Sequence, residues 1–264
     1  MEYAILSIVG LVAGVLGGLM GVGGSVVMIP AMVWVFSPDG DIQQYQAAAM
    51  IVNFLLIGPS VLRHARAKAI YFGVWKCLAP AAIIGILVGV ATSRLDIFTG
   101  DNQVYMKRLF GAFMIYVAAY NLWKMRSAAS EGITAEEAER VTWVKKAGVG
   151  LPMGFSAGLL GIGGGALAVP ALQIILRLPL RNAIATSATT ILTVAWLGAI
   201  VKNATLGGDG TVTRSLTLAA VLAPTAMIGS YLGGHLTHKL PLRVVRAAFV
   251  GLMLVAAAKM FGLL

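Results

Sequence analysis

Two glycine-rich motifs lie in the middle of the two most apolar stretches of the chain, "GVGGS" at 21–25 and "GIGGG" at 161–165. Glycine costs about 1 kcal/mol relative to alanine inside a helix, so each motif predicts a break between two helical arms. The second arms are expected to begin at Gly24–Ser25 and at Gly164–Gly165. The free amides and positive dipole of a helix start bind an anion without a basic side chain. The motifs therefore predict anion binding by backbone groups.

Hydroxyl and amide side chains in the neighbouring apolar stretches are candidates to complete such a site. They could donate to an oxyanion, or they could bond a carbonyl of a neighbouring helix, which is the commoner use in membranes. The glycines could likewise serve only for close helix packing, but two copies in register favour a cavity at both motifs, since unpaired amides need a protein-lined or wet space. The candidate binding residues are Gly21, Gly23, Gly24, Ser25, Gln46, Asn53, Gly161, Gly163, Gly164, Gly165, Thr186, Ser187 and Thr190.

No catalytic residue, metal site or cofactor is expected, and the chain is not expected to be an enzyme. The histidines have no metal-ligand spacing, and the single Cys77 excludes an internal disulfide and a cysteine-built metal site. Acidic residues are nearly absent from the apolar stretches, which argues against cation transport and leaves the coupling ion open.

The composition predicts a polytopic membrane protein. Soluble domains carry about 25% charged residues, whereas this chain of 264 residues has 11% charged and 59% hydrophobic residues and a mean hydropathy of +0.88. The first residues lack the features of a signal peptide and are expected in the mature protein. Spans are expected at 45–62, 70–92, 104–123, 181–201, 216–236 and 242–264, and the longer stretches 3–36 and 147–176 contain the glycine motifs.

The net charge of +10 does not indicate nucleic-acid binding, because the basic residues lie in short loops between apolar stretches. Lys and Arg accumulate on cytoplasmic loops, and a secondary benefit for an anionic substrate stays open. Lys76, Lys202 and Lys259 are expected to snorkel to the membrane surface. No arginine is evident within the spans.

The chain is predicted to be an internal duplication. Position 161 follows position 21 by 140 residues, and "LMGVGGSVVMIPA" from position 19 pairs with "LLGIGGGALAVPA" from position 159. Further on, "APAAIIGILVG" from position 79 pairs with "APTAMIGSYLGG" from position 223. The repeats are placed at 1–125 and 147–264, joined by a cytoplasmic polar linker at 126–146. In this linker Thr134 and Glu137 have capping-box spacing, which predicts a short amphipathic helix.

The distribution of Lys and Arg indicates that the copies are inverted. If each glycine segment were a single crossing, the basic loops of the two copies would lie on opposite sides. If each segment enters and leaves by the same side, ten basic residues lie together on the cytoplasmic side, as the positive-inside rule favours, and both termini lie outside. These ten are Arg63, Arg66, Lys68, Lys145, Lys146, Arg177, Arg181, Lys239, Arg243 and Arg246, leaving Arg94, Lys107, Arg108, Lys202, Arg214 and Lys259 on the other side.

The predicted fold is therefore an all-α polytopic membrane protein of two inverted-topology repeats. Each repeat has a glycine-broken helical segment, re-entrant or discontinuous, plus three membrane-spanning helices. Broken helices that face each other near the midplane are the arrangement expected of secondary transporters.

The whole pattern resembles the sulfite exporter TauE/SafE family, also described as the toluene sulfonate uptake permease family. The resemblance rests on the paired "GVGGS…P" and "GIGGG…P" segments, the "ATS" at 185–187, and the Pro and Gly residues of the following span. It rests also on the Arg before the last span of each copy, and it covers nearly the whole chain outside the linker. The first copy differs in having "QAAAM" from position 46. The resemblance implies that the glycine segments and the "ATS" segment line a transport path.

By this resemblance, the expected function is alternating-access transport of a small sulfur-containing anion, such as sulfite or a sulfonate like sulfoacetate, with export as the direction. A passive anion channel, or an uptake permease for thiosulfate, sulfate or another small organic anion, is the alternative. The expected location is the bacterial cytoplasmic (inner) membrane, in many passes. The expected partners are the anionic substrate and membrane lipid, with no nucleic acid, and a homodimer is left open.

Overall fold

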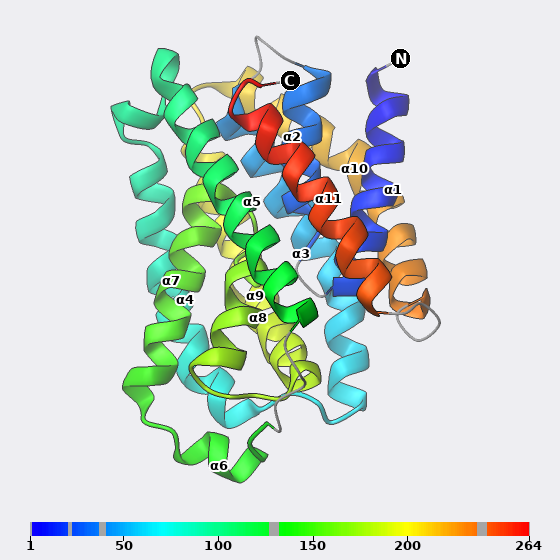
Figure 1. Ribbon diagram of the computed structural model, residues 1–264. Helices are drawn as coiled ribbons and strands as arrows, with labels where there is room; N and C mark the ends of the chain where they lie inside the picture. The colour runs from blue at the N-terminus through cyan, green and yellow to red at the C-terminus, as the bar shows by residue number, and fades with distance from the viewer. Residues whose placement is uncertain (1, 21–22, 37–40, 127–131, 237–241, 264) are drawn as a thin grey trace.

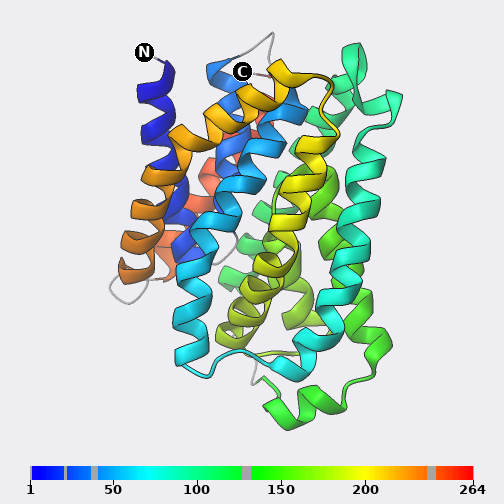
Figure 2. The same ribbon diagram turned by 180° about the vertical axis from the view of Figure 1, so that it is seen from behind.

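The computed structural model describes residues 2–20, 23–36, 41–126, 132–236 and 242–263. Within these residues the molecule is a bundle of α-helices without a strand (Figures 1 and 2). Five of the described helices, α1, α3, α4, α9 and α10, are long and apolar enough to cross a membrane. The prediction of an all-α polytopic membrane protein is confirmed.

The two halves of the described chain contain equivalent helices in the same order. The first half has α1 (Glu2–Met20), α2 (Ser25–Val35), α3 (Ile42–Arg66), α4 (Phe72–Ser93) and α5 (Gln103–Arg126), with the 3-10 turns η1 (Asp96–Phe98) and η2 (Gly100–Asn102) before α5. The second half has α7 (Trp143–Leu160), α8 (Gly165–Ile174), α9 (Leu180–Ala204), α10 (Asp209–Leu236) and α11 (Leu242–Met260).

Each of the six predicted spans coincides with a long helix. These helices, α3, α4, α5, α9, α10 and α11, have between 19 and 28 residues. At 1.5 Å per residue the shortest measures about 28 Å, close to the roughly 30 Å of a hydrocarbon core. By apolar composition α5 and α11 are weaker spans, since both carry Lys or Arg near their two ends.

The first helix of each half packs along the fourth helix of the other half, α1 on α10 and α7 on α4. Glycines allow this close approach: a side chain at Gly14 would collide with the carbonyl oxygen of Ala226, and one at Gly154 with that of Ala82. Gly14 and Gly154 are equivalent positions of the duplication, and so are Ala226 and Ala82. Small residues let membrane helices approach in this way. The two halves therefore interlock rather than form separate domains.

The helices of the two halves run in opposite directions through the molecule (Figures 1 and 2). Helix α1 begins at the end where both termini lie, and α2 runs back toward that end. Helix α7 begins at the opposite end, and α8 runs back toward that opposite end. In the interior α3 contacts its equivalent α9, and α5 contacts α11. How the two halves are oriented in a membrane stays a prediction.

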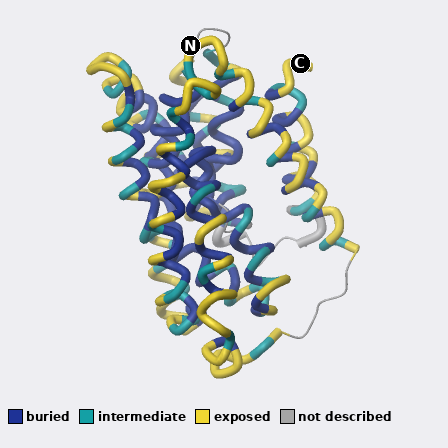
Figure 3. Tube along the Cα trace, turned by 90° about the vertical axis from the view of Figure 1, so that its left-hand side faces the viewer, coloured by how far each residue is buried: buried dark blue, intermediate teal, exposed yellow. Residues whose placement is uncertain are grey.

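The outer faces of the bundle are apolar as well as the core. Figure 3 shows buried residues concentrated between the helices and exposed residues along their outer faces. Large apolar side chains are exposed there on four different helices, among them Ile8, Ile84, Ile200 and Ile228, each more than half exposed. Lipid tails are as apolar as these side chains, so the exposed faces suit a membrane.

The linker contains the predicted short helix, α6 (Ala135–Arg140). Its capping box is present: the Glu137 amide donates to Thr134 Oγ1 at 3.3 Å, and the Thr134 amide donates to Glu137 Oε2 at 2.8 Å. This backbone hydrogen bond, with a second one from the Thr134 hydroxyl, lowers the pKa of Glu137. The helix prediction is confirmed because both capping partners lie within the same turn.

Candidate functional site

The structure places a break at both glycine motifs. Helix α1 ends at Met20 and α2 begins at Ser25, while α7 ends at Leu160 and α8 begins at Gly165, as predicted. Gly161, Gly163 and Gly164 all have left-handed backbone conformations, with φ of 74°, 72° and 77°. Only glycine adopts such values readily. Gly23 has φ of 90°, and Gly21 lies outside the described residues.

Asn53 closes the first break. Its Oδ1 accepts hydrogen bonds from the amides of Gly24 and Ser25, at 3.1 and 3.3 Å, and its Nδ2 donates to Ser25 Oγ at 2.7 Å. Asn53 and Ser25 are both fully buried. In the first half, the helix-start amides of Gly24 and Ser25 are therefore already paired with a side chain from α3.

Asn53 also lies against the second glycine motif. A Cβ atom built on Gly163 would stand 2.9 Å from Asn53 Nδ2, and one on Gly23 would stand 3.1 Å from Asn53 Oδ1. The Asn53 side chain therefore lies between the two breaks and contacts both. The structure brings the predicted residues Gly23, Gly163 and Asn53 together.

The second break has no such cap. Gly164 is the N-cap residue of α8 and cannot offer a side chain, and in the described structure the amides of Gly165 and Ala166 have no hydrogen-bond partner. Thr193, the position equivalent to Asn53, accepts a hydrogen bond from Trp75 Nε1 at 3.2 Å instead. The start of α8 therefore keeps the free amides that an anion site requires.

Gln46 lies against this uncapped break. A Cβ atom on Gly161 would stand 2.7 Å from Gln46 Cβ, so only glycine fits beside it. The Gln46 side chain is 0% exposed, and neither Nε2 nor Oε1 has a partner in the part of the chain that the structure describes. A buried polar group without a partner costs free energy. Gln46 is thus the candidate whose side chain is available for a ligand at the α7 end of this break.

The predicted residues on α9 divide into two groups. Thr190 Oγ1 donates to the Thr186 carbonyl at 2.9 Å, and Thr186 Oγ1 accepts from the Tyr71 amide at 3.1 Å. These two hydroxyls are therefore used by the protein backbone. Ser187 Oγ is buried and has no partner within the described structure.

A cavity of about 50 Å³ reaches the first turn of α8. Its lining includes Ala166, Tyr120, Gln173 and Arg246, and Tyr120 Oη donates to Gln173 Oε1 at 2.8 Å. Arg246 is half-buried and donates to the Lys124 carbonyl at 3.4 Å. The sequence analysis placed Arg246 among the cytoplasmic basic residues and counted it as the Arg before the last span, but did not assign it to the site. Its position just inside the last span of the second copy was the signal that it could face the protein interior.

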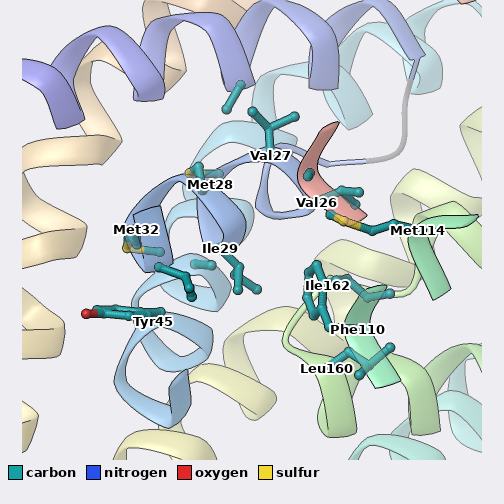
Figure 4. Close-up of a cluster of buried hydrophobic side chains, with 14 of the residues drawn as sticks. Val26, Val27, Met28, Ile29, Met32, Tyr45, Phe110, Met114, Leu160 and Ile162 are labelled. Atoms are coloured by element: carbon teal, nitrogen blue, oxygen red, sulfur yellow. The ribbon is translucent and has the colours of Figure 1, made fainter. Parts of the chain in front are cut away.

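The equivalent space along α2 is filled. Val26 and Ile29, which correspond to Ala166 and Val169, lie in one hydrophobic cluster with Phe110, Met114 and Ile162 (Figure 4). Among the described residues, the cavity with Arg246 lies beside the second arm, whereas the corresponding side chains of the first arm pack in this cluster. The asymmetry follows from side-chain size, since α2 has Val and Ile where α8 has Ala and Val.

Comparison with known proteins gives a consistent set of relatives. The family model described as "Sulfite exporter TauE/SafE" matches residues 6–260. The chain is 30% identical to the "Probable membrane transporter protein MamO" of Magnetospirillum gryphiswaldense, over 98% of this chain and 45% of that protein. It is 27% identical to the "Probable membrane transporter protein MJ0441" of Methanocaldococcus jannaschii, over 94% of this chain and 92% of that protein.

A similar match, at 27% identity, covers 93% of this chain and 92% of the "Probable membrane transporter protein YunE" of Bacillus subtilis. The chain thus spans less than half the length of MamO but nearly all of the other two relatives. No solved structure matches the chain.

Proposed function

Because the chain belongs to the sulfite exporter TauE/SafE family, we propose that it exports a small sulfur-containing anion across the cytoplasmic membrane. Its family and its relatives support a multi-pass membrane transporter rather than an enzyme. The sulfur-containing substrate, the direction and the inner membrane are part of the proposal.

The uncapped start of α8 is the observation that supports anion transport. A sulfite or sulfonate group offers three acceptor oxygens, and the amides of Gly165 and Ala166 supply buried donors, while Gln46 lies at the other end of the same break, beside Gly161. A helix start adds a positive dipole. Neutral donors hold an anion less tightly than a fixed Arg would, so the anion can be released on the far side.

In this proposal the first break has a structural role, and the second break binds the anion. Asn53 ties α2 to α3 and contacts the second motif, so it holds the breaks together. The cavity with Arg246 lies on the side of α8 that leads to the end predicted to be cytoplasmic. An anion would be attracted there by Arg246 and would then reach the α8 start.

Alternating access requires that the two halves move relative to each other around this site. A passive channel would use the same amides without such movement, and an uptake permease for thiosulfate, sulfate or another small organic anion would run in the opposite direction. These alternatives are separated by transport kinetics.

The experiment is counterflow in proteoliposomes. Vesicles loaded with unlabelled sulfite should accumulate radiolabelled sulfite transiently, the uptake should saturate, and sulfoacetate, thiosulfate and sulfate added outside should be ranked by competition. Saturable counterflow supports a carrier, and linear flux without counterflow supports a channel. The proposal is wrong if no tested anion moves faster than into protein-free vesicles.

A further inference from the structure

Lys202 is a fully buried lysine in the last turn of α9. It was expected to snorkel, but it is 0% exposed, and its Nζ donates to Ser93 Oγ at 2.6 Å. Within the described residues no carboxylate lies within ion-pair distance, and this serine is the one hydrogen-bond partner of Nζ. An ammonium has three donors. Two of them are therefore available.

The groups around Lys202 are polar, and one of them is also unpaired. Ser93 Oγ donates to the Val90 carbonyl at 2.7 Å, and the Ser93 carbonyl accepts from Gln43 Nε2 at 2.7 Å. Gln43 is 1% exposed; its Nε2 also donates to the Phe98 carbonyl at 3.4 Å, and its Oε1 has no partner among the described residues. At Ser93, Lys202 thus has unpaired donors, while the free atom of Gln43 is an acceptor.

The local charges do not supply a full counter-ion. Arg94 and Asp41 act on Lys202 with opposite signs, and the Asp41 carboxylate already accepts from the Gln43 amide at 2.9 Å. Helices α4 and α9 both end here, and their negative dipole ends partly compensate the ammonium. A buried charge without an opposite charge still costs several kcal/mol, and intramembrane ionisable residues mark ion paths.

Lys202 and the glycine breaks lie along the same contact between helices α3 and α9. Gln43, Gln46 and Asn53 share one face of α3, at spacings of three and seven residues, and α3 packs against α9. Between the two places Gly198 of α9 lies close to Met50, where a Cβ atom would stand 3.4 Å from the sulfur. The C-terminal end of α9, whose last turn contains Lys202, lies at the end of the molecule where both termini lie (Figure 2).

We propose that Lys202, Ser93 and Gln43 form a second binding site for a small oxyanion, at the opposite end of the α3–α9 contact from the cavity with Arg246. Its role in the transport path rests on the proposed function, but its affinity for an anion does not. The protonated Lys202 supplies the charge and the free donors, and Gln43, whose Nε2 donates to the Ser93 and Phe98 carbonyls, holds Ser93 in place.

The test is a thermal-shift titration of the purified full chain with sulfate, with chloride added to keep the ionic strength constant. Lys202→Met should weaken the sulfate dependence of the melting temperature about tenfold in apparent affinity, the scale of a hydrogen bond to a charged group. Lys76→Met, which removes an exposed lysine from α4, is the matched control and should titrate like the parent. Equal sulfate dependence in Lys202→Met and the parent would overturn the site.

Gln43→Glu serves as a second variant if Lys202→Met does not fold. It introduces the missing carboxylate in the first turn of α3, where a negative charge suits the helix dipole. The introduced carboxylate can pair with Lys202, so the variant should respond more weakly to sulfate than the parent, and the remaining response belongs to the α8 start. An unchanged sulfate response would again overturn the proposal. This experiment measures sulfate binding without transport. The second site can therefore be present in a chain that transports no sulfur anion, and it can be absent from a chain that transports sulfite.

Discussion

Two amide side chains on one face of α3 have opposite hydrogen-bonding states. Asn53 uses both of its polar atoms, on the amides of Gly24 and Ser25 and on the Ser25 hydroxyl, whereas Gln46 uses neither. A paired buried amide stabilises the fold, and an unpaired one lowers stability unless a ligand completes it. The structure therefore separates residues that the sequence presented as equal candidates.

Replacing Gln46 by Leu should weaken sulfite binding and not weaken the fold. The substitution removes two unpaired polar atoms and keeps the side-chain volume similar, so the melting temperature should stay constant or rise. Loss of a donor to a charged ligand should raise the Kd for sulfite about tenfold. Calorimetric titration and a melting curve on the same preparation measure both effects. An unchanged Kd would remove Gln46 from the site.

Asn53→Ala should show the reverse pattern. Three buried hydrogen bonds are lost and two helix-start amides lose their partner, so the free energy of unfolding should fall by about 1 to 3 kcal/mol. Ser25→Ala removes one of these bonds and should cost only about 0.5 to 1.5 kcal/mol. Denaturant titration in detergent gives the ranking. If Asn53→Ala were as stable as the parent, Asn53 would not be holding the first break.

At the scale of elements, local signals in the sequence predicted the helices well. The starts of α2 and α8, the capping box of α6 and the six long spans all depend on residues within a few positions of each other. The cap by Asn53 could not be predicted in this way, because Asn53 lies 28 residues from Ser25 in the chain. The burial of Lys202 depends on the position of the end of α4, and the residues of α9 alone cannot predict that position.

The break before α8 should be intolerant of any side chain. Gly164 has φ of 77°, and a Cβ atom there would stand 2.6 Å from the Met153 carbonyl oxygen. Gly164→Leu should abolish sulfite counterflow, and the smaller Gly164→Ala should reduce it strongly because the backbone strain is the same. Gly148→Leu on α7, where nothing lies within 4 Å of the added atom, is the control and should transport normally. Normal counterflow in Gly164→Ala would show that this conformation is not required.

At the scale of the whole molecule, the helix packing is nearly the same in the two halves, but the buried polar residues differ. The helix contacts repeat between the halves, down to equivalent glycines against equivalent carbonyls. The polar groups do not repeat: Asn53 is matched by Thr193, Lys202 by Leu62, and Gln46 by Thr186. Duplication therefore explains the fold, while substitutions in the interior give the two ends different binding properties.

The last prediction concerns the orientation of the two halves in the membrane. If the copies are inverted in the membrane, the α3–α4 and α8–α9 loops lie on the same, cytoplasmic side. In a Cys77→Ser background, Ala67→Cys and Arg177→Cys should both be shielded from an impermeant thiol reagent in intact cells, and Asp209→Cys should be labelled. All three positions are exposed in the structure, and Arg177 is preferred to its buried neighbour Leu178.

Permeabilised cells provide the control, since all three cysteines should then react at similar rates. Labelling at positions 67 and 177 together with shielding at position 209 would mean that the whole molecule has the opposite orientation in the membrane. The α8 start and its cavity would then face the opposite side of the membrane from the one proposed. Export through Arg246 would have to be replaced by uptake, because the same positive group would meet anions arriving from outside.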